Sequence, residues 1–176
     1  DKSSFDFEAA KAKLRASLRR DYSKIAREWP YQNVPRRIIA EEYISELGSD
    51  DLLDYKMYSF HGEPKLTVVC SDRFSKTGTR MNFYDINWEP MGIHFGHYPP
   101  LPTEFPKPAT YEEMKRLTAE LSKDCPFLRV DFYEIKGCLF IGELTFFPGA
   151  GLETFRPMSK DYELGEWLHL ETVHRS

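Results

Sequence analysis

The spacing of apolar residues predicts a long helix near the start of the chain, over residues 4–28. The apolar positions recur every three or four residues and comprise Phe7, Ala10, Leu14, Leu18 and Ile25. We expect Ser3 or Ser4 to cap this helix. The opposite face is basic, and we interpret it as a solvated surface rather than a polyanion site.

Short runs rich in β-branched and aromatic residues predict strands downstream. Residues 53–60 and 65–71 flank a turn and predict a hairpin, and residues 81–87 predict a further strand. Residues 37–44 are also β-rich. Six of the twelve prolines fall within residues 89–108, which predicts a long ordered loop there.

A second helix and a second hairpin complete the pattern. Thr110 and Glu113 form a capping box at the start of a helix that runs to about Asp124. Residues 127–135 and 138–147 predict two more strands. This order predicts an α+β fold, a mostly antiparallel sheet with flanking helices. The helix residues expected to face inward are Met114, Leu117 and Leu121.

Composition narrows the class of protein. The net charge is -4, so no overall basic field favours a nucleic-acid partner. No apolar run approaches the roughly 18 residues of a membrane span. The three cysteines contain no CxxC motif, which suits a reducing compartment and predicts a cytoplasmic protein.

Two carboxylates face each other in the second hairpin. If the turn is centred on Gly137, Asp131 lies opposite Glu143, and Arg129 lies opposite Thr145. Facing carboxylates repel, and water, a shared proton or a hard cation such as Mg²⁺ can compensate them. The residues alone leave open a metal site and a solvated face compensated by Arg129. We also expect Asp131→Asn and Glu143→Gln to leave folding near wild type, because each relieves the repulsion. The opposite face is expected in the core and carries Leu128, Val130, Phe132, Phe140, Leu144 and Phe146.

This hairpin resembles the C-terminal metal-binding hairpin of ATP-grasp enzymes. The chain has Arg-x-Asp, a turn, and Glu-x-Thr ahead of Pro-Gly, where the family has Arg-x-Asp and Glu-x-Asn ahead of Pro-Gly. By this resemblance Asp131, Glu143 and Thr145 would hold Mg²⁺ against the phosphates of ATP. Thr145 stands where the family usually has Asn. Arg129 would be the catalytic residue that holds the transferring phosphoryl group.

Further segments resemble the TupA-like ATP-grasp group, named after the teichuronopeptide biosynthesis protein, over about residues 25–170. Residues 38–44 look like the hinge between lobes that receives adenine and ribose. Residues 54–56 are similar to the Asp-x-basic segment that follows the hinge in the family. Arg73 comes at the end of the next predicted strand, where the family often has a basic residue. The residues that the resemblance assigns to nucleotide binding are Glu41, Glu42, Tyr43, Ile44, Asp54, Lys56 and Arg73.

The resemblance also bears on the extent of the domain. ATP-grasp enzymes carry an N-terminal lobe with a Lys-bearing strand and a Gly-rich loop, and no such pattern precedes the first predicted helix. We therefore expect residues 1–176 to form a single partial ATP-grasp domain. Residues 1–35 would be a helical lead-in, and residues 36–176 the hinge and the C-terminal lobe. We expect it to be part of a longer enzyme and inactive alone.

The implied function is that of an ATP-dependent carboxylate–amine ligase of cell-surface polysaccharide biosynthesis. Such an enzyme activates a carboxylate as an acyl phosphate with Mg-ATP, here a uronic-acid polymer or an amino acid. One alternative is a glycosyltransferase, or another polysaccharide-synthesis enzyme, that uses a nucleotide-sugar, although the chain has no DxD motif. Another is a non-catalytic ATP-grasp remnant that acts as a binding module.

Overall fold

The computed structural model describes residues 4–41, 52–71, 78–96 and 104–170. Contacts within the chain divide it into two compact units, residues 1–44 and 45–176. Each unit is described by itself. The assignment of one domain to the whole chain stays a prediction.

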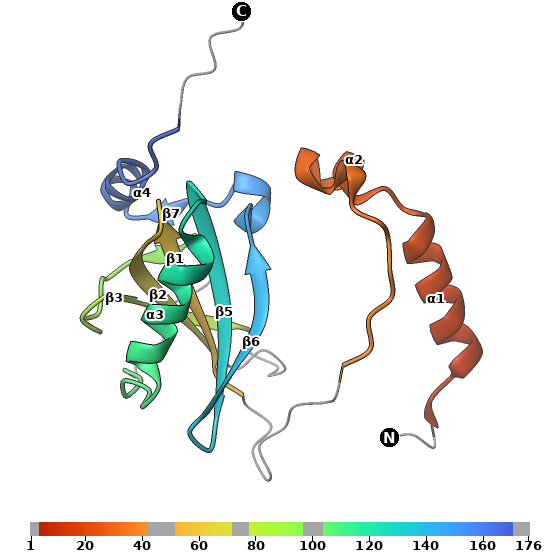
Figure 1. Cartoon of the computed structure of the whole chain (residues 1–176), viewed down its shortest axis with the longest axis horizontal. Helices are drawn as coiled ribbons and strands as arrows, with labels where there is room; N and C mark the ends of the chain where they lie inside the picture. Colours follow the sequence, from red (N-terminus) through yellow and green to blue (C-terminus); the bar gives the residue numbers. More distant parts are fainter. Residues whose placement is uncertain (1–3, 42–51, 72–77, 97–103, 171–176) are drawn as a thin grey trace, which may run out of the picture. The chain divides into compact units, whose positions relative to one another are not determined.

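The first unit is helical (Figure 1). It contains α1 (Phe7–Arg19), α2 (Tyr22–Ala26) and a 3₁₀ helix, η2 (Trp29–Asn33). The prediction of one continuous helix over residues 4–28 is wrong, because Arg20 and Asp21 both have extended backbone between α1 and α2. Asp21 accepts a hydrogen bond from the Ser23 hydroxyl at 2.6 Å, a local bond of the kind that competes with helix interiors.

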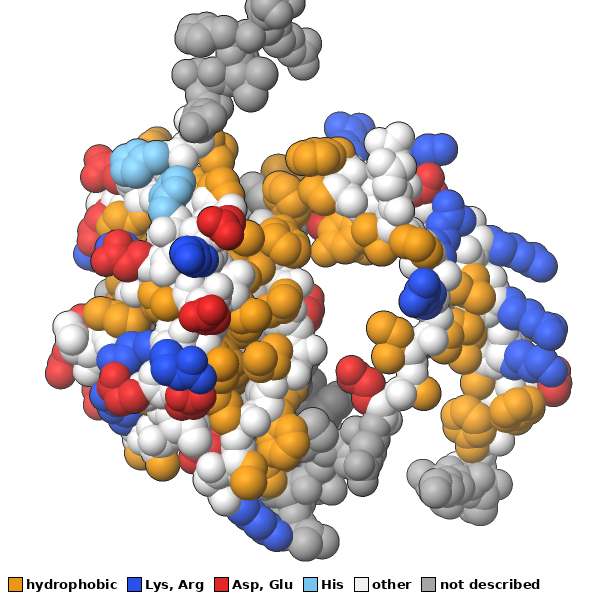
Figure 2. Space-filling model, viewed as in Figure 1, with side chains coloured by type: hydrophobic (Ala, Val, Ile, Leu, Met, Phe, Trp, Pro, Cys, Tyr) orange, Lys and Arg blue, Asp and Glu red, His pale blue; other side chains and the backbone are white. Residues whose placement is uncertain are grey.

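The helix α1 begins one turn later than the sequence suggested. Its N-cap is Asp6, whose Oδ1 accepts the Ala9 N–H at 2.8 Å, rather than Ser3 or Ser4. Figure 2 shows blue Lys and Arg side chains along one side of α1, which matches the predicted basic face. Residues 35–41 have no regular secondary structure, so the β-rich pattern predicted for residues 37–44 forms no strand over 37–41. Residues 42–44 lie outside the described part.

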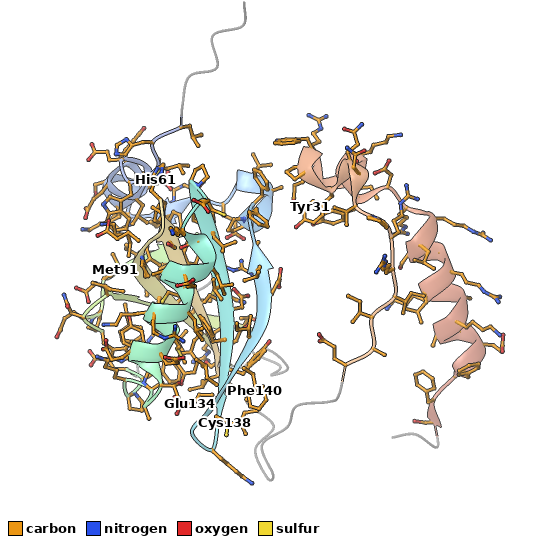
Figure 3. The ribbon with its side chains drawn as sticks, viewed as in Figure 1. Tyr31, His61, Met91, Glu134, Cys138 and Phe140 are labelled. Atoms are coloured by element: carbon orange, nitrogen blue, oxygen red, sulfur yellow. The ribbon has the colours of Figure 1, made fainter. Side chains whose placement is uncertain are left out.

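The second unit is built on a five-stranded antiparallel sheet with the order β3-β2-β1-β5-β6. The strands are β1 (Asp54–Phe60), β2 (Glu63–Ser71), β3 (Arg80–Asp85), β5 (Phe127–Ile135) and β6 (Cys138–Thr145). All five coincide closely with predicted strands, which confirms the α+β expectation. In Figure 3, Glu134, Cys138 and Phe140 lie at the end of the sheet where β5 turns into β6, and His61 lies at the other end.

Both faces of the sheet are buried. The helix α3 (Tyr111–Ser122) packs on one face, as Figure 1 shows, and Met114 there contacts a cluster that includes Met57 and Val130. The other face packs against residues of the short strand β4 (His94–Phe95) and the helix α4 (Met158–Gly165). Between β6 and α4 the chain forms a 3₁₀ turn, η3 (Pro148–Gly151), and a short strand, β7 (Phe155–Arg156), that pairs with β4.

Aromatic residues fix the ends of the proline-rich segment. The Trp88 ring stacks on Tyr84 with ring centroids 4.5 Å apart, and its Nε1 donates to the Phe105 carbonyl at 3.0 Å. The Phe105 N–H in turn donates to the Tyr84 hydroxyl at 2.8 Å. These bonds agree with the predicted ordered loop for its described residues; residues 97–103 lie outside them.

The capping of α3 differs from the predicted capping box. Both the Thr110 N–H and the Thr110 hydroxyl donate to Glu134 Oε2 on β5, at 2.9 and 2.5 Å. Glu113 instead pairs with Arg116 on the exposed side of α3. Leu121 is 39% exposed rather than inward, and Thr118 and Ser122 occupy the buried positions. Ser122 fits there because its hydroxyl is within 2.7 Å of the Ser59 hydroxyl on β1.

This arrangement gives a first testable prediction. Glu134→Ala removes the acceptor of two α3 N-terminal donors and should lower the free energy of unfolding by about 1–2 kcal/mol. Glu113→Ala, which removes only an exposed pair, should change it by less than about 0.5 kcal/mol. Urea denaturation of both variants measures the difference. A larger loss of stability for Glu113→Ala than for Glu134→Ala would support the predicted capping box instead.

Candidate functional site

The β5–β6 hairpin places the predicted polar residues on one face, through a bulge that the sequence did not reveal. Lys136 and Gly137, both with positive φ, form a two-residue turn that pairs Ile135 with Cys138. Continued without interruption, this register would pair Asp131 with Gly142. A bulge at Gly142 shifts the register and pairs Asp131 with Glu143.

The predicted pairs are therefore confirmed, although the turn is not centred on Gly137. Arg129 pairs with Thr145, and Asp131 with Glu143. Beyond the bulge the faces exchange, so Phe140 lies opposite Tyr133, on the face of β5 that carries Asp131.

The prediction that three apolar residues in or just after β6 lie in the core is wrong. Phe140, Leu144 and Phe146 are 40%, 42% and 45% exposed, whereas the β5 residues Leu128, Val130 and Phe132 are fully buried. For Leu144 and Phe146 the physical reason is that β6 is an edge strand, whereas the bulge places Phe140 on the other face. Hydrophobic patterning alone does not distinguish an edge strand from a central one.

Gly142 gives a second prediction. A Cβ at this position would lie 2.6 Å from Cε2 of Tyr133, whose ring lies over the bulge. Gly142→Ala should therefore cost about 1–3 kcal/mol of unfolding free energy, as overpacking does. Gly165→Ala is the matched control, since a Cβ there meets no atom within 4 Å and the residue lies in a helix. Thermal melting compares the two, and equal stability of both variants would contradict the proposed role of the bulge.

A chain of charged side chains crosses from β1 to β6. Lys56 on β1 lies opposite Asp131 on β5, and its Nζ contacts the carboxylates of both Asp54 and Asp131, with the Asp54 distance 2.8 Å. Arg129 binds Asp131 through two parallel bonds, Nε to Oδ1 at 2.7 Å and Nη2 to Oδ2 at 2.8 Å. The Asp54 and Asp131 side chains are 1% and 3% exposed, so this part of the cluster is buried.

The outer end of the cluster reaches solvent at Glu143. Its side chain is 61% exposed, and its Oε2 lies 3.8 Å from Nη2 of Arg129. The Thr145 hydroxyl donates to Glu143 Oε1 at 2.8 Å. The repulsion between Asp131 and Glu143 is therefore compensated by Arg129, which is one of the two arrangements that the sequence left open.

The surroundings hold both cations in their charged forms. Burial acts to lower the pKa of Lys56, but the carboxylates of Asp54 and Asp131 outweigh it and raise that pKa. Burial likewise acts to lower the pKa of Arg129. The hydrogen bonds to Asp131 and its negative charge outweigh burial and raise that pKa. Tyr58, the β1 residue opposite Arg129, has its pKa raised mainly by burial, so it stays neutral. The two cations are thus paired with the buried carboxylates of Asp54 and Asp131, and Glu143 is the exposed carboxylate of the cluster.

Comparison with known proteins assigns the family. A family model described as TupA-like ATPgrasp matches residues 1–169. The chain belongs to the TupA-like ATP-grasp family. No curated protein and no solved structure matches it significantly. The five-stranded antiparallel sheet with flanking helices is compatible with a lobe of a TupA-like ATP-grasp protein.

Proteins of the ATP-grasp family generally bind ATP with Mg²⁺. The side chains predicted to hold the metal can be compared with what Mg²⁺ requires. Asp131, Glu143 and Thr145 offer oxygen atoms, the ligand type that Mg²⁺ prefers. Both Asp131 oxygens are engaged by Arg129 and Lys56, and among the described residues no group of three or more His, Cys, Asp or Glu side chains could hold a metal ion. Of these three residues only Glu143 keeps an exposed carboxylate, so a Mg²⁺ ion held here would depend on Glu143.

The other predicted nucleotide residues of this TupA-like ATP-grasp chain are only partly placed. Asp54 and Lys56 join the cluster of Arg129 and Asp131. Glu41 lies in the first unit, in a segment without regular structure. Glu42, Tyr43, Ile44 and Arg73 lie outside the described residues.

Sequence reasoning missed two features of the site. One is the pairing of Lys56 with Asp131, and the other is Tyr58 beside Arg129. Alternation along β1 does put Asp54, Lys56 and Tyr58 on one face. The missing information was that β1 pairs with β5, a long-range contact that the strand pattern does not encode.

The part of the chain that the structure describes contains no helix long and apolar enough to cross a membrane.

Proposed function

We propose that this chain supplies the phosphate- and metal-binding hairpin of a cytoplasmic, ATP-dependent carboxylate–amine ligase. The observation that carries the proposal is the buried Lys56–Asp131–Arg129 cluster, which ends at the exposed Glu143. Family membership supports ATP as the nucleotide. The carboxylate substrate, a uronic-acid polymer or an amino acid, and the pathway of cell-surface polysaccharide synthesis are proposed from the family resemblance.

Arg129 is the residue that we assign to the phosphoryl group. It contacts Asp131 through Nε and Nη2, which fixes the plane of the guanidinium, and such a group can also donate to phosphate oxygens. A fixed donor beside a transferring phosphoryl group stabilises developing charge without reorganisation. Asp131 acts on the reaction through Arg129, as a positioning residue.

Glu143 and Thr145 are assigned to the metal. When bound, Mg²⁺ would neutralise charge on the β- and γ-phosphates. The Thr145 hydroxyl orients the Glu143 carboxylate through its hydrogen bond at 2.8 Å.

In the proposed reaction a carboxylate oxygen of the substrate bonds to the γ-phosphorus of ATP and ADP leaves. An amine nitrogen then bonds to the acyl carbon, phosphate leaves, and the amine loses a proton.

Calorimetric titration with nucleotides tests this function. We expect ATP to bind with Mg²⁺ present and about tenfold or more weakly in EDTA, a difference of about 1.4 kcal/mol or more. A nucleotide-sugar such as UDP-glucose should bind no better than its nucleotide alone. Tight binding of UDP-glucose with none of ATP would favour a glycosyltransferase, and binding of neither would favour the non-catalytic module.

A further inference from the structure

The second unit contains an apolar pocket that the proposed nucleotide site does not use. Its volume is about 570 Å³, within the usual range for small-molecule sites. Its walls come from β1, from the start of β5, from the segment after β6 and from α4, and include Tyr58, Phe127, Phe147 and Leu164. It lies within the unit 45–176.

The pocket adjoins the charged cluster through Tyr58. This residue lines the pocket and lies opposite Arg129 in the β1–β5 register. Phe146 and Phe147, two further wall residues, directly follow Thr145 along the chain. A molecule in the pocket would therefore have one end near the group that we assign to the phosphoryl transfer.

The charges of the wall are all of one sign. Its ionisable acids are Asp124, Glu153 and Asp161, and no Lys, Arg or His belongs to the described wall. Asp161 accepts the Phe155 N–H at 2.9 Å, so it has a structural role. Glu153 folds over Gly149, where a Cβ would lie 2.2 Å from its Cγ.

Glu153 also acts on the Tyr58 hydroxyl. Burial raises the pKa of Tyr58, Arg129 opposes this, and the charge of Glu153 adds to the increase. A site with apolar walls and an acidic group favours a cation over an anion.

We propose that this pocket binds an amine-bearing substrate with an apolar or aromatic body, its ammonium group beside Glu153. The assignment of this amine as the group that attacks the acyl phosphate rests on the proposed function. The binding itself does not depend on ATP.

Three probes separate the contributions of charge and apolar body. Phenethylamine carries both features, 3-phenylpropionate has the same ring with a negative charge, and ethylamine has the charge without the ring. Ligand-observed NMR titration should show phenethylamine binding about tenfold or more tightly than either of the others. Equal binding of 3-phenylpropionate, or no binding of phenethylamine, would overturn the proposal.

Matched variants locate the binding. Glu153→Gln keeps the shape of the side chain and should weaken phenethylamine binding about fivefold or more. Glu166→Gln, an exposed position at the end of α4 outside the pocket wall, should leave it unchanged. An unchanged affinity in Glu153→Gln, with the fold intact by circular dichroism, would contradict the role of Glu153. If the wild-type protein binds phenethylamine but not Mg-ATP, the proposed nucleotide site is refuted and the proposed amine site is not.

Discussion

Asp131→Asn is expected to lower the free energy of unfolding by about 3–5 kcal/mol, because it removes the central charge of a buried ionic cluster. Asp131 is 3% exposed and contacts both Lys56 and Arg129. Asparagine keeps the shape but leaves two largely buried cations with less compensating charge. Urea denaturation at neutral pH measures the loss.

Glu143→Gln is the natural control for this prediction. Glu143 lies directly opposite Asp131 but is 61% exposed, and its ion pair with Arg129 is 3.8 Å long. Exposed pairs of this kind contribute about 0–1 kcal/mol, so the variant should fold nearly as well as wild type. Comparable losses in the two variants would show that burial does not distinguish the two carboxylates.

Lys56→Met is expected to cost a similar amount, about 3 kcal/mol or more, because Asp54 and Asp131 would then face each other without the cation between them. Both carboxylates are almost fully buried. Lys160→Met is the matched control, since Lys160 pairs with Glu163 at the surface and its loss should cost less than about 1 kcal/mol.

The double variant tests whether these residues act as one unit. Lys56→Met combined with Asp131→Asn should cost less than the sum of the single changes by about 1 kcal/mol or more, because the second change removes a charge that the first left uncompensated. Strict additivity, measured in the same denaturant series, would mean that the two side chains are energetically independent.

Local patterns predicted the strands and the facing pairs of the hairpin. Alternation along β5 and β6 placed Asp131 and Glu143 on one face, and the assumed turn centre at Gly137 made them opposite; the structure reaches the same pairing through a turn at Lys136 and Gly137 and a bulge at Gly142. Turn chemistry at Lys136 and Gly137 indicated where the hairpin reverses.

Features that depend on distant contacts were not predictable in this way. The exposure of Leu144 follows from the edge position of β6, and the capping of Thr110 by Glu134 follows from the packing of α3 against β5. The same limit explains the expectation that Asp131→Asn would leave folding near wild type. The sequence showed the repulsion from Glu143, whereas the bond to Lys56 requires that β1 pair with β5.

The central claim is that the exposed end of the charged cluster binds Mg-ATP. Glu143→Gln tests it most directly, because we expect this variant to fold normally while it loses the exposed carboxylate that we propose as the metal ligand. Glu120→Gln, an exposed change on α3, serves as the control.

The decisive measurement is the calorimetric affinity of these two variants and of wild type for ATP in the presence of Mg²⁺. We predict that Glu143→Gln weakens binding about tenfold or more, while Glu120→Gln binds as wild type does. Wild-type affinity in a folded Glu143→Gln variant would contradict the claim.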